Sequence, residues 1–188
     1  NVRYDNFFRI FYAGVLSPDR DFISIINAGL EFDNVIIEIA GYGFYENEII
    51  ALSKKNSRIS FLGQIPYEKV IERTFQSNLL FALYDPKFPN NQYASPNKLF
   101  EAMMCGKPIL ISDKTNMATI VKEENCGLII PYGDYNALKK ALFNLIHSPD
   151  LCKKLGENGR KAYENKYNWE IMEQKLLKLY TQLDIIDK

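Results

Sequence analysis

The sequence predicts an α/β fold built on a doubly wound parallel sheet of about six strands, with helices on both faces and a helical C-terminal tail. Short apolar runs, such as LLFALY at 79–84 and PILIS at 108–112, are typical of buried strands. Amphipathic segments of helical period separate these runs, and glycine or proline marks most of the junctions. Strands and helices that alternate in this way favour a Rossmann-like sheet.

The strands are expected at residues 8–15, 34–40, 58–62, 79–84, 108–112 and 127–130. The helices between them are expected at about 20–30, 46–55, 66–76, 95–105 and 117–123. Only helical patterns follow Asp134, which caps the first of three helices; Ser148 and Pro149 begin the second, and Asn168 caps the third. The third helix, within residues 168–188, has an apolar stripe that needs a partner surface. The stripe is formed by Trp169, Met172, Leu176, Leu179 and Leu183.

Length, hydrophobic content and charge balance indicate a globular domain and argue against several classes of partner. The chain has 188 residues, 47% of them hydrophobic, which suits one globular domain over residues 1–188. Lysine plus arginine and aspartate plus glutamate both number 23, so neither nucleic acid nor an anionic membrane is an expected partner. No apolar run is long enough to span a membrane, and peripheral association of a longer protein is not excluded by this.

Three scattered cysteines favour free thiols and a cytoplasmic location over a disulfide framework or a zinc site. The chain begins at Asn1 without methionine, and we expect it to be a piece of a longer protein.

The segment SPNKLFEAMMCGKP contains the strongest candidate site. Ser95 is expected to be the N-cap of a helix whose first residue is Pro96. Asn97, Lys98 and Glu101 share a polar face near the positive end of this helix, so an anion such as a diphosphate would bind there. Glu101 is an acceptor suited to the two hydroxyls of a ribose. A solvated ion pair between Lys98 and Glu101 is the simpler alternative.

Two other loops lie where ligands bind in parallel sheets, after the first and second strands. The first, GVLSPDRD, contains Arg20, which is either a ligand-binding or an ordinary surface residue. Asp19 and Asp21 in the same loop have a spacing that could hold a divalent cation, but a helix cap at Asp19 is favoured. The second loop contains Gly41-Tyr42-Gly43, which is weak as a dinucleotide fingerprint and is better explained as a tight turn.

Other chemistries have little support. His147, the sole histidine, lies at the end of an amphipathic helix and is expected to be structural. No Ser/His/Asp or Cys/His set suggests a nucleophile.

Several motifs in order resemble the C-terminal, donor-binding domain of GT-B glycosyltransferases of the retaining family-four type. They are GVLSPDRD, IEIAGYG, ISFLGQIP, SPNKLFEAMMCGKPIL, ENCGLIIPYGD and YNWEIMEQKLLKLY. The resemblance implies a domain that binds a UDP- or GDP-sugar as donor, with no metal or other cofactor required. It also implies a missing N-terminal half that binds the acceptor, onto which the helix at 168–188 packs back.

The resemblance also implies roles for particular residues. Glu101 matches the glutamate that holds the ribose hydroxyls, and Arg20 matches the basic residue that contacts the diphosphate. Residues 61–65, with Gly63 and Gln64, should flank the base. Three glycines should line the nucleotide or keep its loops close, namely Gly14, Gly41 and Gly43.

Two positions depart from the family pattern. Tyr93 stands where the family has a glutamate that contacts the donor sugar, and Val15 stands where it has an arginine. We expect Lys98, with the N–H groups around Ser95 and Asn97, to supply the missing positive charge, so that Arg20 and Lys98 stabilise the leaving diphosphate.

These departures leave a second function open, a non-catalytic nucleotide-sugar-binding or assembly module of the same fold. A metal-dependent GT-A enzyme using Asp19 and Asp21, and a nicotinamide dehydrogenase, fit the motifs less well.

Overall fold

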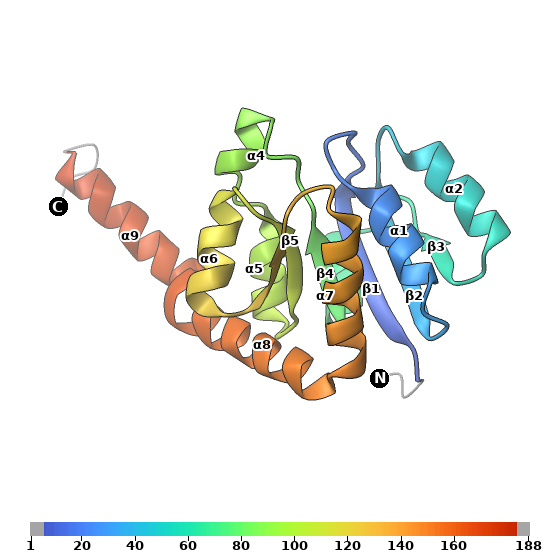
Figure 1. Ribbon diagram of the computed structural model, residues 1–188. Coiled ribbons are helices and arrows are strands. Elements are labelled where there is room, and N and C mark those ends of the chain that lie inside the picture. Colours follow the sequence, from blue (N-terminus) through green and yellow to red (C-terminus); the bar gives the residue numbers. More distant parts are fainter. Residues whose placement is uncertain (1–5, 184–188) are drawn as a thin grey trace.

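The computed structural model describes residues 6–183 and contains a six-stranded sheet in which every strand is parallel to its neighbours (Figure 1). The strands are β1 (Phe8–Val15), β2 (Val35–Tyr42), β3 (Ile59–Phe61), β4 (Leu79–Ala82), β5 (Ile109–Ser112) and β6 (Gly127–Ile130). Their order across the sheet is β3-β2-β1-β4-β5-β6, so the winding direction changes between β1 and β4. This order confirms the predicted doubly wound, Rossmann-like fold.

Helices cover both faces of the sheet. One face is covered by α1 (Phe22–Leu30), α2 (Glu46–Lys55) and α7 (Tyr135–His147), and the other by α3 (Tyr67–Gln76), α5 (Asn97–Met104) and α6 (Asn116–Glu124). α8 (Pro149–Ala162) packs against α5 and α7 and continues through a π-helical turn (Tyr163–Tyr167) into α9 (Trp169–Gln182). α9 extends away from the sheet and its helices (Figure 1).

The core consists of two layers because alternate residues of each strand face opposite sides of the sheet. In β5, Leu110 joins the layer beneath α1 and α7, while Ile109 and Ile111 join the layer beneath α5 and α6. All three side chains are at most 1% exposed. Burial on both faces explains why the strands appear in the sequence as continuous apolar runs.

Two helices begin at other residues than the sequence predicts. The side chain of Asp21, not that of Asp19, caps α1 by accepting a hydrogen bond from Ser24 N at 3.2 Å. α5 begins at Asn97, and its N-cap residue is Pro96, which has no side-chain acceptor. Ser95 is therefore not the N-cap. In addition, the loop before α5 contains a short helix, α4 (Pro89–Tyr93), that the sequence did not predict.

The start of the C-terminal helix agrees with the sequence, because Asn168 caps α9 by accepting a hydrogen bond from Ile171 N at 2.9 Å. None of the residues of α9 is buried. Trp169 is 65% exposed and Leu179 is 50% exposed, so most of the apolar stripe is not covered by the described part of the chain. Residues 184–188 of the predicted tail lie outside the described residues.

Candidate functional site

A cavity of about 370 Å³ lies where the carboxyl ends of β1 and β2 meet the start of α5. This is the edge of a doubly wound sheet at which ligands bind, beside the change in winding direction between β1 and β4. Six of the residues singled out in the sequence line the cavity, namely Gly14, Gly41, Gln64, Asn97, Lys98 and Glu101. These six residues come from four separate segments, which converge on one site.

Glycine is needed at the two strand ends that form the cavity wall. Gly14 and Gly41 are register partners in β1 and β2, and a Cβ added to Gly41 would lie 1.8 Å from the carbonyl oxygen of Gly14. A Cβ added to Gly14, which has a φ of +146°, would lie 3.3 Å from Lys98 Nζ. The absence of a side chain at Gly14 therefore leaves room for the lysine.

The N-terminal end of α5 faces the same cavity through Asn97 and Lys98. No side chain caps this end, since Ser95 Oγ instead accepts a hydrogen bond from Asn116 Nδ2 at 3.3 Å. The first N–H groups of a helix without a side-chain cap are available to an anionic ligand, and the helix dipole favours negative charge there.

Lys98 is a buried cation, with 8% of its surface exposed. Its Nζ donates a hydrogen bond to Tyr84 Oη at 3.0 Å and lies 4.3 Å from the centroid of the Tyr12 ring. Burial opposes the charge, but the two neighbouring phenols outweigh it and raise the pKa of Lys98 above its ordinary value. Within residues 6–183 no carboxylate forms an ion pair with Lys98. The ammonium thus contacts phenol groups that do not neutralise its positive charge.

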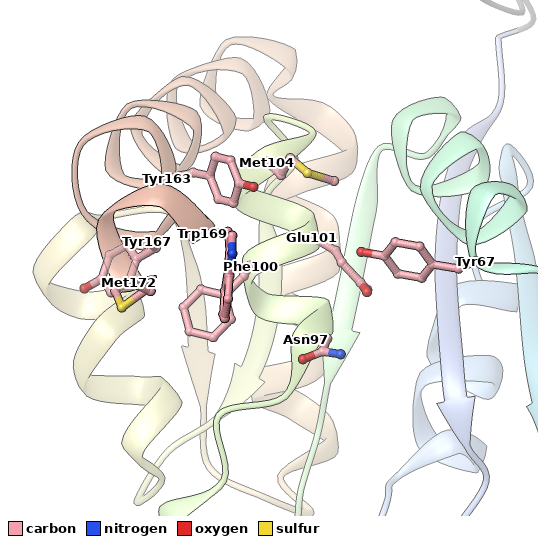
Figure 2. A pocket seen from close by; sticks show the side chains of 9 residues that line it. All are labelled: Tyr67, Asn97, Phe100, Glu101, Met104, Tyr163, Tyr167, Trp169 and Met172. Atoms are coloured by element: carbon pink, nitrogen blue, oxygen red, sulfur yellow. The ribbon is translucent and has the colours of Figure 1, made fainter. Parts of the chain in front are cut away.

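Glu101 lies one helical turn beyond Lys98 and is 9% exposed. Burial raises the pKa of its carboxyl group, while the positive charge of Lys98 and a hydrogen bond from Tyr67 act in the opposite direction. Figure 2 shows the hydroxyl group of Tyr67 pointing toward this carboxyl group. The alternative of a solvated Lys98–Glu101 ion pair is wrong, because both side chains are buried and do not form an ion pair.

Arg20 does not line the cavity. Its guanidinium carbon lies 3.4 Å from the centroid of the Tyr84 ring, and its Nη1 forms an ion pair with Asp19 and donates to Asn91 Oδ1 at 2.7 Å. Tyr84 therefore contacts both Arg20 and Lys98. The Arg20 side chain is partly buried and is not a free surface residue.

The two aspartates of this loop are engaged in other interactions. Asp19 pairs with Arg20 and accepts hydrogen bonds from Ser17 and Asn91, while Asp21 caps α1. In the part of the chain that the structure describes, no group of three or more His, Cys, Asp or Glu side chains could hold a metal ion. The sequence predicted that Asp19 caps α1, but the structure shows that Asp21 does so.

The other candidate residues do not line this cavity. A Cβ at Gly43 would lie 2.9 Å from Leu16 O, so this glycine serves close packing of two loops. Gly63 adopts a φ of +63° and accepts a hydrogen bond from Gly41 N at 2.8 Å, which places the neighbouring Gln64 at the cavity. Tyr93 is 78% exposed on α4, and Ser95 is also exposed.

A second cavity of about 400 Å³ adjoins the first and shares Tyr67, Asn97 and Glu101 with it (Figure 2). The rest of its lining is apolar or aromatic and comes from α5, the π-helical turn and α9. These residues are Phe100, Met104, Tyr163, Tyr167, Trp169 and Met172. The sequence motifs drew attention to none of them as site residues, nor to Tyr12 and Tyr84.

Comparisons with known proteins agree with this geometry. The family model described as "Glycosyl transferases group 1" matches residues 1–162. An uncharacterized glycosyltransferase of Methanocaldococcus jannaschii is 26% identical over 174 residues, which are 92% of this chain and 47% of the relative. The chain thus spans about half the length of the curated relatives it matches.

Solved structures share the fold. Sucrose-phosphate synthase from Thermosynechococcus elongatus superposes with a TM-score of 0.81 at 23% identity, over 95% of this chain and 46% of the synthase. Anabaena HepE in complex with UDP-glucose gives a TM-score of 0.77 at 17% identity, over 94% of this chain and 49% of that chain. The fold therefore corresponds to one half of larger enzymes. Because the family model covers well over half of the sequence, the chain belongs to the group 1 family of glycosyl transferases.

Proposed function

We propose that the chain is the donor-binding domain of a retaining glycosyltransferase, which transfers a hexose-type sugar from a nucleoside-diphosphate sugar to an acceptor. The observation that carries the proposal is the buried, unneutralised ammonium of Lys98 beside the buried carboxyl group of Glu101 in one cavity. A cation suits the phosphate oxygens and a carboxylate suits the hydroxyl donors of a ribose, and the two side chains lie one helical turn apart on the same helix face. The UDP-glucose complex of the Anabaena neighbour supports a donor of this class.

In this proposal Lys98, the first N–H groups of α5 near Asn97, and Arg20 contact the diphosphate. Glu101 accepts hydrogen bonds from the ribose, and Gly63 and Gln64 flank the base, which is uracil or guanine. Gly14, Gly41 and Gly43 keep the backbone near the ligand. Tyr93 and Ser95 lie on the side of the donor sugar.

In this proposal the domain contributes to catalysis by stabilising the leaving group, the nucleoside diphosphate. Departure of the nucleoside diphosphate develops negative charge on its oxygens, and donors fixed in advance lower the energy of that state. In this proposal Lys98, which lines the cavity, and Arg20, which stacks on Tyr84, are the catalytic residues, because they would supply the positive charge that stabilises the departing diphosphate. The proposal needs no metal ion and no protein nucleophile in this domain.

The acceptor would bind to a separate N-terminal half, toward which α9 would extend. The chain by itself is then expected to bind nucleotide without transferring sugar. We also propose a cytoplasmic location, which the three free thiols support. Within residues 6–183, none of the helices has the length and apolar character required to cross a bilayer.

Calorimetry of the chain with UDP, GDP and their sugar conjugates tests this function. Lys98→Ala should weaken diphosphate binding at least about tenfold in low salt, because a buried charge-assisted hydrogen bond is lost. Lys161→Ala, at an exposed lysine of α8, is the matched control and should bind like the unchanged chain. Equal affinities of the two variants would contradict the role of Lys98.

If the unchanged chain binds the diphosphates, the assembled longer enzyme decides between the two functions left open by the sequence. Transfer of sugar by that enzyme supports the catalytic function, and binding without transfer supports the non-catalytic module.

A further inference from the structure

Tyr84 contacts both cations that the proposed function assigns to the diphosphate. It follows β4, and its side chain is 3% exposed. The guanidinium carbon of Arg20 lies over the Tyr84 ring at 3.4 Å from the centroid, and Lys98 Nζ donates a hydrogen bond to Tyr84 Oη at 3.0 Å. One buried phenol therefore connects a loop residue that precedes α1 with a residue of α5.

Backbone hydrogen bonds fix this arrangement. Arg20 and Tyr84 form an isolated antiparallel β-bridge. On one side of it Asp21 N donates to Leu83 O at 3.0 Å, and on the other Asp85 N donates to Asp19 O at 3.0 Å. The loop after β1 is thus paired with the chain after β4. The backbone therefore brings Arg20 and Tyr84 next to each other, and the contacts of Nη1 with Asp19 and Asn91 hold the guanidinium over the ring.

The chemistry of a phenol suits this position. A carboxylate in the same place would neutralise Lys98, whereas a phenolic oxygen accepts its hydrogen bond and leaves the positive charge in place. Within residues 6–183 the Arg20 side chain donates hydrogen bonds through Nη1 alone, so its Nε and Nη2 donors have no hydrogen-bond partner there. Tyr84 can therefore orient both cations while both remain able to bind an anion.

We propose that Tyr84 is a positioning residue for the diphosphate of the nucleotide, an inference that rests on the proposed function. Its ring fixes the plane of the Arg20 guanidinium, and its hydroxyl group fixes the ammonium of Lys98. The two charges are then held in place before the ligand arrives, so that less ordering is required on binding.

Conservative variants separate the two contacts of Tyr84. Tyr84→Phe keeps the ring under Arg20 and removes the acceptor for Lys98, and we expect it to weaken binding of UDP or GDP about tenfold. The affinity for uridine or guanosine, which lack phosphate, should not change. Tyr84→Leu also removes the ring and should weaken diphosphate binding further. Tyr135→Phe is the matched control, because it removes one phenolic hydrogen bond to Glu31, away from the cavity.

A double variant tests whether Tyr84 acts through Lys98. In a Lys98→Met background, Tyr84→Phe should cause no further loss of diphosphate affinity, whereas a general structural defect would cause the same loss in both backgrounds. Unchanged diphosphate binding by Tyr84→Phe, or an equal loss of nucleoside and diphosphate binding, would overturn this inference alone. If the unchanged chain binds neither UDP nor GDP, the proposed function fails first and this inference with it.

Discussion

At the scale of single residues, the burial of Lys98 and Glu101 is unfavourable for folding, and the proposed ligand would offset this cost. Exposed ion pairs contribute at most about 1 kcal/mol, and burial of two charged groups costs several kcal/mol unless close pairing offsets it. Here both side chains are buried, and within residues 6–183 Lys98 contacts phenol groups and forms no ion pair. Folding stability gains little from this arrangement. A ligand that supplies phosphate oxygens to Lys98 and hydroxyl donors to Glu101 would offset the cost.

The raised pKa of Glu101 predicts that binding of a ribonucleotide depends on pH. Burial makes the folded chain bind this proton more strongly than the unfolded chain, so the group lowers stability as pH rises from the ordinary pKa of 4.5 through the raised value. Ribose hydroxyls that donate to the carboxylate favour its charged form, and binding therefore releases a proton. Affinity should increase with pH across this window and level off above it.

The measurement compares a ribose nucleotide with its dideoxyribose analogue, because the titration of the phosphates cancels in the difference. Calorimetry in buffers of different ionisation enthalpy gives the number of protons released. Glu101→Gln should abolish the pH-dependent difference between the two ligands. A difference that persists in this variant would assign the proton to another group.

The sequence predicted Lys98, Glu101, Gly14, Gly41, Gln64 and Asn97 as members of one site, and the structure brings these six together. The sequence did not predict that Lys98 is buried, because the spacing of residues along a helix indicates which face they share but not how far that face is covered by neighbouring elements. Tyr12 and Tyr84 could not be recognised either, since an aromatic residue at the end of an apolar run has the same pattern as a core residue. Their role appears only when β1, β4 and α5 are packed together.

At the scale of elements, the contact between β1 and α5 depends on one position without a side chain. Gly14 combines a φ of +146° with a close approach to Lys98 Nζ. Gly133 has a φ of +77°, but a Cβ there would meet no atom within 4 Å. Both glycines have a positive φ that L-residues rarely adopt, and they differ in their surroundings.

Gly14→Ala should therefore weaken diphosphate binding as well as stability, while Gly133→Ala should affect stability alone. An L-residue at such a φ costs ~1–3 kcal/mol, which urea unfolding can measure for both variants. Only the methyl group at Gly14 presses on the ammonium of Lys98, and we expect a loss of UDP or GDP affinity there. If Gly14→Ala binds as well as Gly133→Ala, Lys98 does not need the space beside Gly14.

The boundaries of the elements show which local signals are reliable. β1, α2 and β6 have the predicted boundaries. The predicted start of α5 was wrong by one residue, since Ser95 and Pro96 satisfy the usual sequence signature of a helix start while Ser95 Oγ accepts a hydrogen bond from Asn116 instead. A side chain 21 positions away overrode the local signal.

At the scale of the whole molecule, α9 is the element whose sequence the fold explains least. Its apolar stripe is exposed, although every other long helix buries part of one face within residues 6–183. The chain also spans about half of its relatives, 47% of the Methanocaldococcus protein and 46% of the Thermosynechococcus synthase. Both observations support the proposal that the stripe packs against the proposed N-terminal, acceptor-binding half of a longer enzyme.

Substitution of one leucine in each environment tests this expectation. In the chain alone, Leu179→Ala on α9 should change the free energy of unfolding by less than about 0.5 kcal/mol, because the side chain is 50% exposed. Leu142→Ala on α7, at a fully buried leucine, should cost ~2–5 kcal/mol. In a longer enzyme that includes the acceptor-binding half, Leu179→Ala should become destabilising as well, since the stripe would then be buried against that half. Urea unfolding of both proteins provides the comparison, and an unchanged cost of Leu179→Ala in the longer enzyme would show that α9 does not pack on the additional half.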